Sequence, residues 1–155
     1  MNRGVGIKKF LVIALMTTII LLTDVVQAAH STQENFNHIL NTCVSALKDT
    51  DDYVDVMKKG DDKVISLRRQ DCDSLQETLQ FFQHNSTEGA ESMSYILTAR
   101  CVLVARSAKL GYYLDAIKAY RSGNSALVEE YKRRMVKANQ EAEQYRIKFL
   151  NTYGY

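Results

Sequence analysis

The most regular apolar pattern in the chain lies between Met93 and Ala119, where it predicts a helix with two buried faces. One set of positions, separated by steps of three, four or seven, comprises Met93, Leu97, Cys101, Val104, Ala108, Tyr112 and Ala119. A second set comprises Ile96, Leu103, Leu110, Leu114 and Ile117. Because each spacing keeps its residues on one helix face, this segment is expected to be the central helix of a bundle, with neighbours on both sides.

Three further segments each carry one apolar stripe at helical spacing. The first stripe comprises Phe36, Leu40, Cys43, Leu47, Val54 and Met57, and only Thr50 interrupts it. The second comprises Ile65, Cys72, Leu75, Leu79 and Phe82. The third comprises Tyr131, Met135, Ala138, Ala142, Tyr145 and Phe149.

Polar, glycine-containing turns separate the four segments, and the chain contains no proline, the strongest helix breaker. Short connections make successive helices antiparallel neighbours. The sequence therefore predicts an all-α, up-down-up-down four-helix bundle with helices near residues 32–58, 62–84, 87–121 and 125–151.

The N-terminal segment has the pattern of a secretory signal peptide. Three basic residues precede an apolar run at positions 10–22, which is short for a membrane span of roughly 20 residues. The small-residue pattern Val26-Gln27-Ala28 then marks a cleavage site. We expect residues 1–28 to be a cleaved signal peptide and residues 29–155 to form a helical-bundle domain in the periplasm or outside the cell. The alternative is an uncleaved leader that anchors the chain to a membrane.

Three cysteines, Cys43, Cys72 and Cys101, are each separated by 29 residues. In an exported chain, cysteines oxidise where geometry permits. Two antiparallel helices bring residues level when these are equidistant from the connecting turn, and the midpoint between Cys72 and Cys101 falls in the turn at residues 84–89. A Cys72–Cys101 disulfide is therefore the favoured interpretation, which leaves Cys43 as a buried thiol or as the bridge of a homodimer. A bridge that includes Cys43 and a set of three free core thiols are the alternatives.

The charges are divided unequally along the expected mature chain. Residues 29–91 contain 12 acidic and six basic side chains, whereas residues 92–155 contain five acidic and 11 basic ones. The halves thus carry −6 and +6, and their sum of zero gives no reason to expect a nucleic-acid partner. The two halves either attract each other within the bundle or present charge to a partner.

No arrangement of residues typical of catalysis or metal binding is present in the sequence. The histidines, at positions 30, 38 and 84, are scattered, and there is no HExxH, CxxC or glycine-rich phosphate loop. We therefore expect a protein that is not an enzyme and that holds no cofactor or metal.

Seven of the nine tyrosines lie at or after Tyr112. Tyrosine together with arginine is typical of protein-binding surfaces. The sequence predicts an exported protein that binds another protein, as an inhibitor, an immunity-type protein or an adaptor. The expected binding residues are Tyr112, Tyr113, Tyr120, Arg121, Tyr153 and Tyr155. The alternative is a carrier of a small molecule or lipid, with a cavity inside the bundle lined by Phe82, Met93, Tyr95 and Tyr112.

Overall fold

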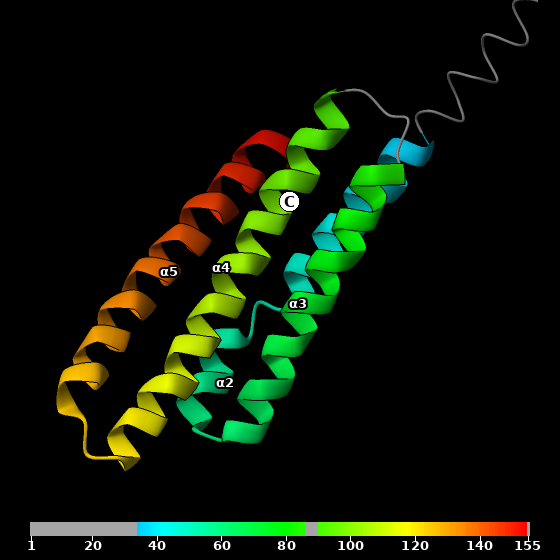
Figure 1. Ribbon diagram of the computed structural model, residues 1–155. Coiled ribbons are helices and arrows are strands. Elements are labelled where there is room, and N and C mark those ends of the chain that lie inside the picture. Colours follow the sequence, from blue (N-terminus) through cyan, green and yellow to red (C-terminus); the bar gives the residue numbers. More distant parts are fainter. Residues whose placement is uncertain (1–33, 86–89, 155) are drawn as a thin grey trace, which may run out of the picture. The chain divides into compact units, whose positions relative to one another are not determined.

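A computed structural model describes residues 34–85 and 90–154, and these residues are almost entirely helical (Figure 1). Residues 34–49 are helical and are followed by α2 (Tyr53–Lys59), α3 (Asp62–Asn85), α4 (Ala90–Arg121) and α5 (Ser125–Tyr153). The expected signal peptide lies outside the described residues. The chain divides into two compact units after Asn37, and the second unit, from His38 onward, contains α2 to α5.

The expected all-α bundle is confirmed. Successive long helices run in opposite directions, and α4 packs against α2, α3 and α5, as expected for a central helix (Figure 1). Gly60 ends α2 in the left-handed conformation with φ 70°, which favours a residue without a side chain. The side chain of Asn124 accepts a hydrogen bond from the Leu127 amide at 3.1 Å and so caps the start of α5. Within the described residues, no helix is both long enough and apolar enough to cross a membrane.

The prediction of one continuous helix at residues 32–58 is wrong in one respect, because residues 50–52 are not helical. The Thr50 hydroxyl donates to the Ala46 carbonyl at 3.0 Å. A side chain that hydrogen-bonds to the preceding turn competes with the helical backbone pattern. The Asp51 amide accordingly bonds to Lys48 and the Tyr53 amide to Thr50, each three residues back rather than four. We call residues 50–52 the helix break.

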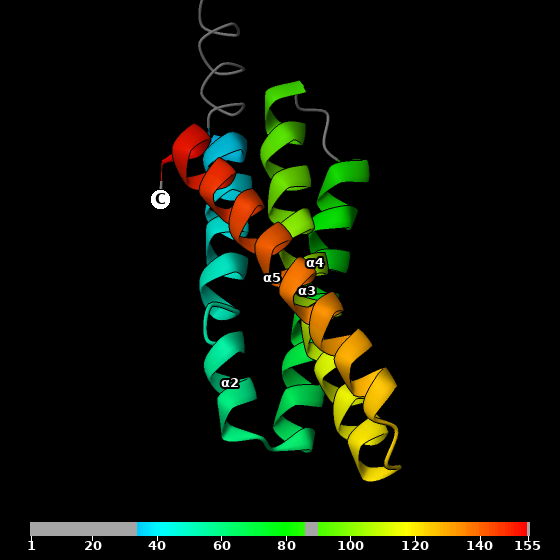
Figure 2. The same ribbon diagram turned by 90° about the vertical axis from the view of Figure 1, so that its left-hand side faces the viewer.

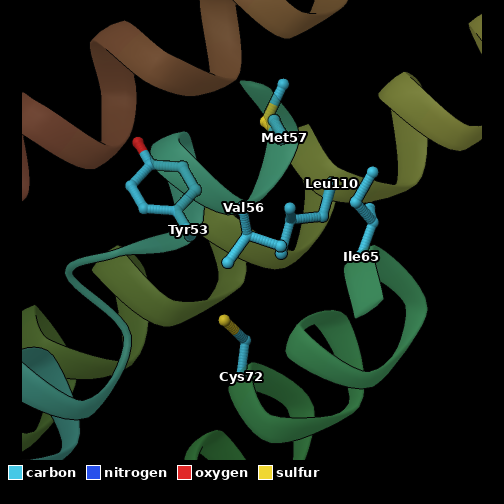
Figure 3. Packing of buried hydrophobic residues seen from close by; sticks show 6 residues of the cluster. All are labelled: Tyr53, Val56, Met57, Ile65, Cys72 and Leu110. Atoms are coloured by element: carbon cyan, nitrogen blue, oxygen red, sulfur yellow. The ribbon is translucent and has the colours of Figure 1, made fainter. Parts of the chain in front are cut away.

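The two apolar sets of α4 have different environments. Ile96, Leu103 and Leu110 from the second set are fully buried, whereas Leu97 and Val104 from the first set are 45% and 51% exposed. The expectation of two buried faces therefore holds for only one of the two sets. Figure 3 shows part of the buried region, in which Leu110 lies among side chains from α2 and α3: Tyr53, Val56, Met57, Ile65 and Cys72.

The expected disulfide between Cys72 and Cys101 is wrong, since all three cysteines are free thiols. The Ser107 hydroxyl donates a hydrogen bond to the Asp73 carboxylate at 2.6 Å, so these two residues lie level on α4 and α3. The midpoint of this pair in the sequence is residue 90, whereas the expected disulfide requires a midpoint within residues 84–89. The first turn of α4 extends beyond the end of α3 and shifts the register (Figure 1). The two cysteines are therefore seven residues out of level, about 10 Å along the helices, which exceeds disulfide reach.

Cys43 is fully buried, so its position does not favour the expected bridge to a second chain. Cys101 is partly exposed instead. Burial raises the pKa of the Cys43 and Cys72 thiols to about 12 in each case. Since the thiolate is the reactive form, both buried cysteines are protected by their inaccessibility and by their protonation.

This difference predicts how the thiols react with the disulfide reagent DTNB at about pH 8. In the folded protein, one thiol per chain should react readily, and Cys101→Ser should remove that reaction. In denaturant without reductant, all three thiols of the natural sequence should react. Recovery of only one thiol under denaturing conditions would contradict the structure, because it would reveal a disulfide.

Candidate functional site

Arg106 is a charged residue in the centre of the bundle. Its side chain extends from α4 to the helix break and is 1% exposed. One terminal nitrogen donates to the Leu47 carbonyl at 2.7 Å and to the Thr50 hydroxyl at 2.5 Å. The other donates to the Asp51 carboxylate at 2.5 Å, so that the buried charge has a counter-ion. Burial of an arginine is costly unless it is paired and hydrogen-bonded in this way.

The break explains why arginines gather here. When an amide bonds three residues back instead of four, a carbonyl of the preceding turn loses its regular donor. Arg106 supplies a donor to the Leu47 carbonyl, and Arg68 on α3 supplies one to the Asp49 carbonyl at 3.0 Å. Arg68 also forms an ion pair with Asp52 at 2.9 Å. Side chains from two other helices therefore satisfy the interrupted backbone.

Tyr53 connects this arrangement to α5. The Arg106 guanidinium lies 5.2 Å from the centre of the Tyr53 ring, and the Lys109 ammonium lies 5.1 Å from it, both within the range of a cation–π contact. The Tyr53 hydroxyl donates to the Asn139 side-chain oxygen at 3.0 Å. Figure 3 shows this hydroxyl pointing away from the apolar cluster toward α5. Burial is the main cause that raises the pKa of Tyr53, while the charge of Arg106 acts in the opposite direction.

Lys109 is the second buried cation, and it differs from Arg106 in its partners. It is 8% exposed, and its ammonium donates to the same Asn139 oxygen. In the described part of the chain, no carboxylate lies within ion-pair distance of it. Burial lowers the pKa of Lys109, and the charge of Glu143 acts in the opposite direction. We call Tyr53, Arg106, Lys109 and Asn139 the polar layer.

Helix α5 crosses the other helices obliquely (Figure 2). Two grooves lie along the contact between α4 and α5. The inner groove adjoins the polar layer and has a volume of about 510 Å³. It is lined by Lys109, Lys132, Met135, Val136, Asn139 and Gln140. The outer groove has a volume of about 290 Å³ and is lined by Ala108, Tyr112, Arg134, Lys137, Ala138 and Glu141.

The structure does not bring the expected binding residues together on one surface. Tyr112 lines the outer groove, but Tyr113 packs partly buried against the apolar cluster of Figure 3. Tyr120 is 77% exposed near the end of α4, and the neighbouring Arg121 forms an ion pair with Asp62 at 2.7 Å.

At the other end of α5, Tyr153 packs against Tyr95 and Phe149, with ring centres 5.2 and 5.3 Å apart. Tyr155 lies outside the described residues. The expected binding residues within the described part of the chain are thus distributed over both ends of the α4–α5 pair, and Tyr112 lines the outer groove.

Three of the residues expected to line a carrier cavity are placed as follows. Tyr95 is fully buried against Tyr153, whereas Tyr112 faces the outer groove. Phe82 packs edge-on against His38. The printed contacts of these three side chains are with different neighbours, and the carrier alternative stays a prediction.

Sequence reasoning missed the polar layer, although one signal for Arg106 was present. Arg106 lies three residues after Leu103 and four before Leu110, at a position where the second apolar stripe of α4 continues. A charged residue at such a position is either exposed or specifically paired. Its partners come from a helix break that the pattern did not show.

Comparison of the chain with family models, with curated proteins and with solved structures gives no match. In the described residues, no group of three or more histidine, cysteine, aspartate or glutamate side chains is arranged to hold a metal ion.

The pairing of Arg106 predicts unequal effects for two acidic residues near the break. Asp51→Ala should lower the free energy of unfolding by about 2 kcal/mol, because Arg106 then keeps a buried charge without its counter-ion. Asp55→Ala should cause no measurable loss, since Asp55 pairs with Lys58 on the exposed surface of α2. Urea unfolding of the two variants tests this expectation, and equal stability of both would contradict it.

Proposed function

We propose that this protein is exported from the cytoplasm and acts without catalysis by binding another protein, as an inhibitor, an immunity-type protein or an adaptor. The outer groove is the proposed contact surface. The leader pattern at residues 1–28 supports export.

The observation that carries the proposal is the contact of Arg134 with two tyrosine rings. Its guanidinium lies 5.8 Å from the centre of the Tyr112 ring and 5.9 Å from that of Tyr131. Tyrosine and arginine dominate the energetics of protein interfaces, because they bury large areas and retain polar groups that orient the partner. Two aromatic rings also hold the arginine in place, which lowers the entropy lost on binding.

The charges around the groove favour an acidic partner segment. Arg134 pairs with Glu130, and Lys137 lies 4.0 Å from Glu141, both on the exposed surface of α5. Exposed pairs of this kind contribute little free energy, so a partner carboxylate replaces them at low cost. Residues 92–155 carry a net charge of +6, which would accelerate association with an acidic partner and make the rate sensitive to salt.

Site-specific photo-crosslinking tests the proposed surface. A benzophenone side chain at position 112 should capture a defined protein from the native extract. The same group at position 81 should not, because Phe81 is similarly aromatic and 65% exposed but lies on α3. Equal capture from both positions, or capture from neither, would contradict the proposal.

The purified partner then permits a matched comparison of two adjacent arginines. Arg134→Ala should weaken binding by at least about tenfold, as expected for a residue at the centre of an interface. Arg133→Ala removes the same charge from an exposed position that does not line the groove, and its affinity should stay within about twofold of the natural sequence. Similar losses in both variants would indicate a non-specific charge effect and exclude the outer groove as the contact.

A further inference from the structure

We propose that the inner groove is a binding site for an amphipathic carboxylate, a single negative charge attached to an aliphatic body. In this site, Lys109 holds the charge and the side chains of α5 hold the body. The inference is independent of the protein-binding function proposed above, because it concerns a different groove and different residues.

Lys109 provides the first part of the argument. An ammonium group has three donors, and within the described residues one acceptor is present, the Asn139 oxygen. That oxygen also accepts a hydrogen bond from the Tyr53 hydroxyl. A cation that is 8% exposed and has no contacting carboxylate is expensive to bury. An anion bound in the groove would supply both the missing acceptors and the missing counter-charge.

The surroundings of Lys109 also favour an anion. The nearest buried cation, Arg106, is already neutralised by Asp51. Glu143 is engaged by Arg146 at 3.0 Å. A second ammonium group, that of Lys132, belongs to the same groove and pairs with Glu129 on the exposed surface. The groove is therefore lined by two lysines within a mostly apolar surface, and in the described residues no acid contacts Lys109.

The shape and the remaining lining define the rest of the ligand. A volume of about 510 Å³ lies within the range of small-molecule sites. Met135 and Val136 supply an apolar wall, and Val136 is 58% exposed, so that a ligand in the groove can contact it. A carboxylate at Lys109 places an attached aliphatic chain along this wall.

Calorimetric titration of the purified protein with three probes tests the proposal. Decanoate combines the charge with the aliphatic body, decan-1-ol has the body without the charge, and acetate has the charge without the body. Decanoate should bind at least about tenfold more tightly than either of the other two. Failure of decanoate to bind with a Kd below about 1 mM would overturn the proposal, as would equal binding of acetate or decan-1-ol.

Two variants locate the site. Lys109→Met retains the bulk of the side chain and removes the charge, so it should weaken decanoate binding at least about tenfold and leave decan-1-ol unaffected. Lys118→Met is the control, because this lysine is on the same helix but its side chain is 76% exposed. Unchanged decanoate affinity in Lys109→Met would overturn the proposal.

If Lys109→Met fails to fold, the variant Val136→Glu provides a second test of the same groove. It changes an exposed position and introduces a negative charge at the groove, so decanoate binding should again fall at least about tenfold while helicity is retained. If decanoate bound this variant as tightly as the natural sequence, the ligand would not occupy the inner groove. Neither variant alters Tyr112 or Arg134, so loss of decanoate binding is separable from loss of the protein partner.

Discussion

The fold depends on the hydrogen bonds and ion pair that Arg106 makes with the helix break. A guanidinium in the centre of a bundle is unfavourable by itself, and so is a helix interrupted at its buried side. Here each compensates for the other, because the break presents a carbonyl, a hydroxyl and a carboxylate to one side chain. The interaction joins residues 55 to 59 positions apart and thereby fixes α4 against the first part of the bundle.

The polar layer extends this constraint to α5. The Tyr53 ring contacts two cations, Arg106 and Lys109. The Tyr53 hydroxyl and the Lys109 ammonium both donate to the same oxygen of Asn139. Hydrogen-bonded layers of this kind restrict the relative positions of helices more narrowly than apolar contacts do, because their geometry is directional. The polar layer also places the charge of Lys109 beside the inner groove, along the contact between α4 and α5. Packing and candidate binding chemistry thus arise from the same residues.

Much of the fold could be predicted from local signals. The apolar stripes predicted the approximate lengths of α3 and α5. Gly60 ends α2 in the left-handed conformation and Asn124 caps the start of α5, as expected for these residue types. The break could not be predicted, because one threonine in an apolar stripe is compatible with a continuous helix. The register of α3 against α4 also could not be predicted from the sequence. It depends on how far α4 extends past α3, and this shift places Cys72 and Cys101 at different levels.

The short length of α2 has a consequence for how the protein opens. A seven-residue helix is far below the length at which helices persist alone, so α2 owes its structure to its contacts with α3 and α4. Segments of this kind detach at a lower free energy than the whole molecule unfolds. Transient release of α2 would remove Tyr53 from above Lys109 and uncover the Cys72 thiol, while the α4–α5 pair stays assembled. Solvent and solutes would thus first reach the interior at the site that α2 vacates.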